Sequence, residues 1–176
     1  MHIITIDFEA SCLPRHGRSF PIEVGIADGD RSRSWLIRPH DSWAGWDWTA
    51  EAEALHGLSR ERIACEGQPA AVVLAELAGA TQGRRVVADS LIDQYWLDTL
   101  AAAAGAPTPF TIQHVATLFD EQGADERRII AAMAFADGQG ATRHRAAGDA
   151  LWLSALIAHL CGGAMPPPLP VLIAAQ

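Results

Sequence analysis

The chain begins with a short apolar segment that ends on two carboxylates. Residues 2–8 are rich in β-branched and aromatic side chains, which is typical of a buried β-strand. Asp7 and Glu9 are two residues apart, so both carboxylates project from one face of such a strand. Two acids at the end of a buried strand repel each other unless a cation lies between them. The segment therefore predicts a central strand with an acidic carboxyl end.

The later patterns favour an α/β fold. Strand-like segments at 19–27 and 33–37, joined by a turn at 28–30, predict a three-strand antiparallel meander with the first strand. The next strand candidate lies at 85–88 and a last one at 111–115, where a helix start is the alternative. Helical patterns occupy 49–55, 69–79, 93–104, 126–135 and 146–160. Strands first, then alternating strands and helices, predict a mixed sheet flanked by helices in a single domain of residues 1–176.

The charge balance limits the partners of the protein. The chain has 13 Lys and Arg against 21 Asp and Glu, a formal net charge of −8. A phosphate backbone favours a basic surface, so we expect no broad binding of long duplex nucleic acid. For a nucleic-acid partner, this balance would favour single-stranded or short molecules over long duplex. It does not exclude an enzyme whose bound cations supply positive charge locally.

Cysteine use and hydropathy predict a cytoplasmic protein without a membrane partner. Cys12, Cys65 and Cys161 are scattered and form no CxxC pair, which is typical of reduced thiols. Asp7 interrupts the N-terminal apolar run, and no run reaches the ~18 residues that a membrane span needs. The segment 171–173 of the proline-rich tail is apolar enough to pack on a partner or a second copy, so a homodimer is one expected assembly.

A further acid heads the last long helical pattern. Downstream of Asp149, apolar side chains at helical spacing define one face: Trp152, Leu153, Leu156, Ile157 and Leu160. A carboxylate in line with this face needs a partner or a metal, because burying an unpaired charge costs several kcal/mol. The alternative is an acid held in the first turn by the helix dipole. His144 precedes Asp149 by five residues and is a candidate base beside it.

Two mid-chain acids compete as a further ligand. Asp93 is followed by Trp96, Leu97 and Leu100, which repeats the pattern after Asp149. Asp89 follows the strand candidate 85–88 and is more easily explained as a cap or turn residue. We therefore favour Asp93 and keep Asp89 as the alternative.

The order of these elements is more informative than any one spacing. A shuffled chain of this composition would contain about 0.6 Asp-x-Glu pairs by chance. The ordered set Asp-x-Glu, Asp, His-x₄-Asp resembles the DEDDh family of 3′–5′ exonucleases, which have an RNase H-like fold. Five segments carry the resemblance: Asp7-Phe8-Glu9-Ala10-Ser11, Pro21-Ile22-Glu23-Val24-Gly25, Ala54-Leu55-His56-Gly57-Leu58-Ser59, Val86-Val87-Ala88-Asp89-Ser90-Leu91-Ile92-Asp93 and His144-Arg145-Ala146-Ala147-Gly148-Asp149.

The resemblance implies a metal-dependent nuclease. Asp7, Glu9, Asp93 and Asp149 would hold two Mg²⁺ or Mn²⁺ ions, and His144 would accept the proton of the attacking water. The products would be nucleoside 5′-monophosphates released from the 3′ end of DNA or RNA.

Four further residues are candidate substrate contacts: Phe8, Ala10, Leu58 and Arg145. For Phe8 a place in the core is the alternative, and for Arg145 a solvated loop. Two functional alternatives also stay open on the same fold. One is a non-catalytic nucleic-acid-binding module, and the other is a proofreading module that acts with a polymerase.

Overall fold

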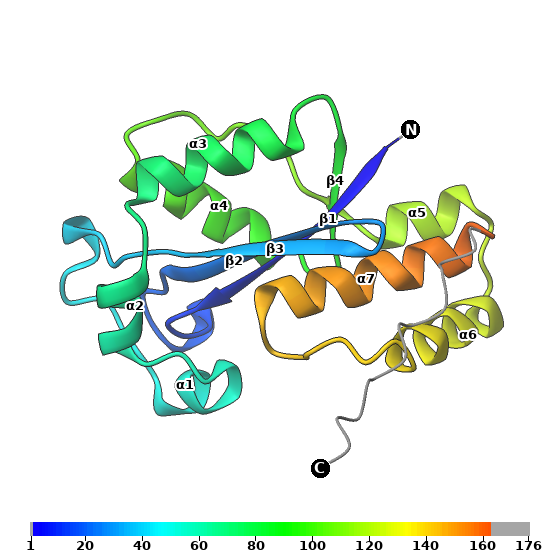
Figure 1. Ribbon diagram of the computed structural model, residues 1–176, viewed down its shortest axis with the longest axis horizontal. Helices are drawn as coiled ribbons and strands as arrows, with labels where there is room; N and C mark the ends of the chain where they lie inside the picture. The colour runs from blue at the N-terminus through cyan, green and yellow to red at the C-terminus, as the bar shows by residue number, and fades with distance from the viewer. Residues whose placement is uncertain (1, 163–176) are drawn as a thin grey trace, which may run out of the picture.

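The structure is a computed structural model that describes residues 2–162 (Figure 1). The tail segment 171–173, on which the expected homodimer depends, lies outside the described residues. The strands are β1 (Ile3–Ala10), β2 (Pro21–Asp28), β3 (Arg31–Leu36), β4 (Arg85–Ala88) and β5 (Gln113–His114). The α-helices are α1 (Ala50–His56), α2 (Arg60–Glu66), α3 (Ala70–Thr81), α4 (Ile92–Ala103), α5 (Ala116–Glu121), α6 (Glu126–Asp137) and α7 (Ala146–Leu160). Two short 3₁₀ helices are η1 (Pro14–His16) and η2 (Asp41–Trp43).

The strands form one mixed sheet in the order β3-β2-β1-β4-β5. β1, β2 and β3 make the antiparallel meander, while β4 and β5 run parallel to β1. The carboxyl ends of β1 and β4 therefore meet at one end of the sheet. The α/β prediction of a mixed sheet with a three-strand meander is confirmed.

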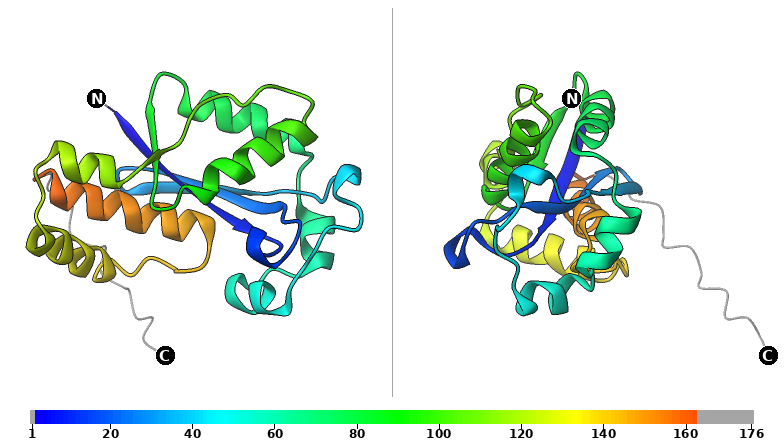
Figure 2. Two further views of the ribbon diagram at one scale, coloured as in Figure 1. Left: turned by 180° about the vertical axis from the view of Figure 1, so that it is seen from behind. Right: turned by 90° about the vertical axis from the view of Figure 1, so that its left-hand side faces the viewer.

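Helices cover both faces of the sheet (Figures 1 and 2). α4 packs against β1 and β2 on one face, and α3 packs against α4. α7 packs against β1, β2 and β3 on the other face, and α6 packs against α7. Because side chains alternate along β1, this strand serves both layers. Ile4, Ile6 and Phe8 enter the core shared with α3 and α4, whereas Thr5 donates a hydrogen bond to the Ala150 carbonyl of α7 at 2.6 Å.

Side-chain caps define the starts of the two short helices α1 and α2. The Thr49 hydroxyl accepts from Ala52 N–H and caps α1, and the Ser59 hydroxyl accepts from Arg62 N–H and caps α2. The two alternatives for residues 111–115 are both present in part, because β5 is followed directly by α5. Within residues 2–162, no helix combines the length and the apolar character that a transmembrane segment requires.

Candidate metal centre

The candidate acids meet where β1 and β4 end. Asp7 and Glu9 lie on β1, and a break in register after Glu9 marks a bulge in its pairing with β2. Asp89 follows β4 directly, and Asp93 lies in the first turn of α4. Asp149 lies in the first turn of α7. The topology thus brings carboxylates from four segments to one place, and the helix N-termini present positive dipole ends beside them.

Two groups of three carboxylates share Asp7. One oxygen from each of Asp7, Glu9 and Asp149 lies within 4.8 Å of the others. One oxygen from each of Asp7, Asp89 and Asp93 does the same. Both mid-chain acids therefore lie in the cluster, Asp93 buried and Asp89 exposed. This shared acid allows two cation positions side by side.

Four acids of this cluster have raised pKa values in the metal-free protein. Burial and the neighbouring carboxylates raise the pKa of Asp7 well above its ordinary value. Burial and then the charge of Asp149 raise the pKa of Glu9 to about 8. Burial and the adjacent Asp89 likewise raise the pKa of Asp93. Burial also raises that of Asp149, although the Arg143 guanidinium opposes this effect. A divalent cation would relieve the repulsion, because it favours the ionised form of each acid.

The donor set fits a hard divalent cation. It consists of carboxylate oxygens, the ligands that Mg²⁺ and Mn²⁺ prefer. Asp93 is 1% exposed, and its Oδ2 has no hydrogen-bond partner within residues 2–162. A buried oxygen without a partner is costly unless a ligand completes the site. Asp149 is held differently, since Arg143 Nε lies 2.8 Å from its Oδ1 in an ion pair without hydrogen-bond geometry.

His144 lies beside the acids on the loop that leads into α7. Its backbone N–H donates to Asp149 Oδ2 at 2.7 Å, and its side chain is exposed. Its φ of 60° lies in the left-handed region, which is uncommon for a residue with a side chain. Backbone strain of this kind concentrates at functional sites. The expected base is thus tied through its main chain to a candidate metal ligand.

A pocket of about 290 Å³ adjoins Glu9. Its walls include Phe8, Ala10, Leu13, Leu55, His56 and Trp96. The structure places Phe8 at 4% exposure and Ala10 at 7%, so both belong to the core and also line the pocket.

Two expected substrate contacts have other surroundings. Leu58 is 0% exposed within the main core and does not line the pocket, because the turn after α1 points it inward. His56 and Leu55 lie on the pocket wall instead. Arg145 does not lie free in a solvated loop, since its guanidinium donates twice to Glu23.

His56 and Glu23 were not singled out from the sequence. The His56 Nδ1 accepts from Leu58 N–H at 3.0 Å, and burial lowers its pKa. The imidazole is therefore neutral with its proton on Nε2, an atom without a hydrogen-bond partner in residues 2–162. Glu23 sits opposite Glu9 in the β1–β2 ladder. For Glu23, the sequence feature that indicates a special role is a carboxylate within the apolar strand segment 19–27.

Comparisons with known proteins identify the fold. No protein-family model matches the chain, and no curated protein matches its sequence. Among solved structures, a full-length 3′-exonuclease is 14% identical to this chain, with a TM-score of 0.66. The match covers 93% of this chain and 83% of the exonuclease chain. The zinc-bound complex of Escherichia coli exonuclease I with single-stranded DNA is 12% identical with a TM-score of 0.64. Exonuclease I from Methylocaldum szegediense is 14% identical with a TM-score of 0.65.

These likenesses define a class of fold. The chain matches 90% of its own length to each exonuclease I but spans only 39% of those chains. The five-strand mixed sheet flanked by helices is the RNase H-like fold that these exonucleases share. The predicted RNase H-like architecture is confirmed at this level.

Proposed function

We propose that the protein is a 3′–5′ exonuclease that hydrolyses phosphodiester bonds at the 3′ end of single-stranded or short nucleic acid. The observation that carries the proposal is the pair of carboxylate groups around Asp7, with their oxygens within 4.8 Å in each group. The RNase H-like fold, which this chain shares with exonucleases, supports the proposal.

Two groups of carboxylates that share Asp7 would hold the two cations. Asp7, Glu9 and Asp149 would hold one Mg²⁺ or Mn²⁺ ion, and Asp7 with Asp93 the other, with Asp89 as an additional oxygen donor. Asp7 would serve both positions because it belongs to both groups. When bound, the ions would lower the pKa of the attacking water and stabilise charge on the phosphate and on the leaving oxygen.

His144 would accept the proton of the attacking water. An imidazole is suited to this role because it can both accept and release a proton. The exposed side chain can reach solvent and pass the proton on. The bond to Asp149 sets the backbone from which the imidazole projects.

The pocket beside Glu9 would receive the terminal nucleoside. Its wall is mainly apolar and includes the aromatic side chains of Phe8 and Trp96 and the imidazole of His56. Aromatic surfaces bind bases of any sequence. One of the matching exonuclease I structures contains single-stranded DNA, and the net charge of −8 here also disfavours long duplex.

Product analysis tests the proposed reaction. Single-stranded DNA and RNA oligomers are incubated with the protein and Mg²⁺, and the released nucleotides are separated by chromatography. We expect nucleoside 5′-monophosphates, and none when EDTA replaces the metal. Release of 3′-monophosphates or of internal fragments would contradict the proposal, and the two polymers compared side by side give the sugar preference.

A further inference from the structure

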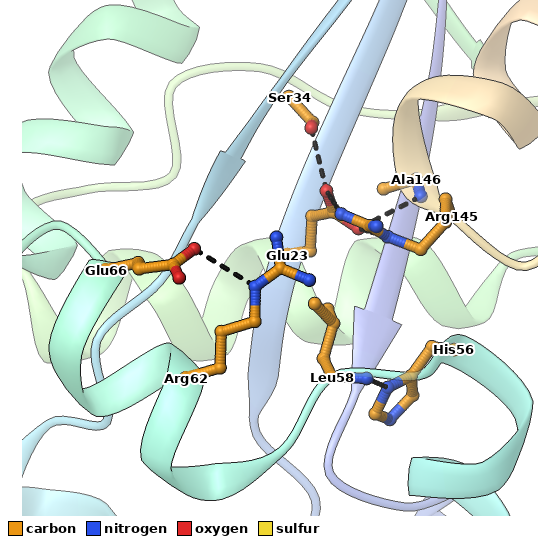
Figure 3. A network of polar contacts seen from close by, with 8 residues as sticks. All are labelled: Glu23, Ser34, His56, Leu58, Arg62, Glu66, Arg145 and Ala146. Atoms are coloured by element: carbon orange, nitrogen blue, oxygen red, sulfur yellow. Dashed lines mark hydrogen bonds and ion pairs between the residues drawn. The ribbon is translucent and has the colours of Figure 1, made fainter.

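Glu23 is a buried acid that the metal cluster does not use. Its side chain is 1% exposed on β2, directly opposite Glu9. Glu23 Oε1 accepts from Ser34 Oγ at 2.7 Å and from Arg145 Nη2 at 2.8 Å. Its Oε2 accepts from Arg145 Nε at 2.9 Å and from Ala146 N–H at 3.3 Å (Figure 3). Four donors satisfy this carboxylate, so it has no lone pair left for a cation.

Glu23 is bound to the residues that follow His144 directly. Arg145 is the N-cap of α7 and Ala146 is its first residue, 122 and 123 positions along the chain from Glu23. The two parallel bonds between a guanidinium and a carboxylate fix the relative orientation of both groups, which one point contact cannot do. The start of α7 is thereby fixed to strand β2 of the sheet.

The backbone around His144 changes direction sharply. His144 has a φ of 60°, Arg145 is extended with φ −142° and ψ 128°, and Ala146 begins the helix. His144 N–H bonds to Asp149 on one side, and the bonds of Glu23 hold the two residues on the other. His144 therefore lies between two fixed points, and only the first of them, Asp149, is itself a candidate metal ligand.

We propose that Glu23 is a positioning residue that holds His144 in place through its bonds to Arg145 and Ala146. The inference rests on the proposed nuclease function for its catalytic consequence. A buried ion pair contributes little net stability compared with apolar residues of similar size, so we assign this one to the geometry that it specifies. Glu23 itself belongs to neither carboxylate group and does not line the pocket beside Glu9.

The main test compares Glu23→Gln with Glu66→Gln. Glu66 forms an exposed ion pair with Arg62 four residues earlier (Figure 3), with side chains 55% and 43% exposed, and it belongs to neither carboxylate group. In Glu23→Gln we expect kcat to fall by about 10- to 100-fold, less than the roughly 10²–10⁴-fold that complete loss of a general base costs. KM should stay within about twofold, because Glu23 does not line the pocket beside Glu9. Glu66→Gln should change neither quantity.

A double-mutant cycle separates positioning from general destabilisation. If Glu23 acts through His144, Glu23→Gln added to His144→Ala should lower kcat by less than about twofold further. An additive loss would overturn the proposal, since it would mean that Glu23 affects catalysis by another route. If Glu23→Gln does not fold, Arg145→Lys replaces it as the test variant. This substitution keeps the positive charge but loses the two parallel hydrogen bonds to Glu23. We expect it to lower kcat with KM unchanged, and a rise in KM alone would overturn the proposal.

Amide hydrogen exchange gives a readout that does not depend on activity. In Glu23→Gln the amides of residues 143–146 should exchange at least about tenfold faster than in the wild type, with the rest of α7 unchanged. Unchanged exchange at these residues would overturn the inference. If the wild-type protein degrades no nucleic acid, the proposed function fails, and the exchange result alone still decides whether Glu23 holds this segment.

Discussion

Gly25 lies directly opposite Asp7 in the β1–β2 ladder, beneath the first turn of α7. A Cβ atom on Gly25 would overlap the backbone of Ala146 and Ala147. Backbone atoms cannot rotate away as the end of a side chain can. The missing side chain therefore lets the helix that carries Asp149 lie against the strand that carries Asp7.

Gly25→Ala should separate these two acids. We expect the free energy of unfolding to fall by about 1–3 kcal/mol, as in overpacked cores, and the affinity for Mn²⁺ to fall with it. Gly79→Ala is the matched control, because nothing lies within 4 Å of a Cβ there and Gly79 is inside helix α3. That variant should be neutral or more stable by up to about 1 kcal/mol. Urea unfolding and metal titration measure both effects, and an unaltered metal affinity in Gly25→Ala would contradict this role.

Asp93 should contribute more to nuclease activity than Asp89. Asp93→Asn removes a buried carboxylate whose Oδ2 has no hydrogen-bond partner within residues 2–162, so we expect nuclease activity to fall by at least about 100-fold. The metal-free variant should be more stable than the wild type, because a buried like charge is gone. Asp89→Asn, at an exposed position, should lose less than Asp93→Asn. Activity is measured as initial rates at saturating Mg²⁺. A larger loss from Asp89→Asn than from Asp93→Asn would mean that Asp89 is the main mid-chain metal ligand.

Glu9 should make the metal-free protein less stable as pH rises. Its pKa is about 8 in the folded protein against an ordinary value of 4.5. Between these values the folded state binds more protons than the unfolded state, so the free energy of unfolding falls with rising pH. Metal affinity should rise over the same range, because cations bind the ionised acids. Urea unfolding in EDTA, from about pH 5 to about pH 9, should show a shallower fall in Glu9→Gln. Equal slopes in the two proteins would contradict the assignment.

His144→Gly should separate activity from stability. Glycine adopts a φ of 60° without strain, so the variant should be as stable as the wild type or more stable by up to about 1 kcal/mol. Its nuclease activity should fall by about 10²–10⁴-fold because the base is lost. His2→Ala, at another exposed histidine, should change neither quantity. Full activity in His144→Gly would remove His144 from the mechanism.

The sequence predicted the elements that depend on local chemistry. The alternation from Ile3 to Glu9 fixed the faces of β1, and the apolar face after Asp149 fixed α7, whose observed bounds equal the expected ones. Asp93 and Asp149 were expected to head helices, and both do.

What the sequence did not predict depends on contacts between distant segments. Glu23 could be read as a strand residue, but its bonds to Arg145 follow only from the packing of α7 on β2. Leu58 was expected at the substrate, and its burial follows from how the turn after α1 meets the core. The sequence favours Asp93 over Asp89 as a single mid-chain metal ligand. In the structure, one oxygen from each of these acids lies within 4.8 Å of an oxygen of Asp7.

The most direct measurement is a time course of digestion of a 5′-labelled single-stranded oligomer by the wild-type protein and by Asp7→Asn, each with Mg²⁺. Asp7 belongs to both carboxylate groups, so its charge is the one on which both cation positions depend. The account predicts a ladder that shortens stepwise from the 3′ end with the wild type, and an intact oligomer with a folded Asp7→Asn variant. An intact oligomer with the wild type, or an equal ladder with both proteins, would contradict it.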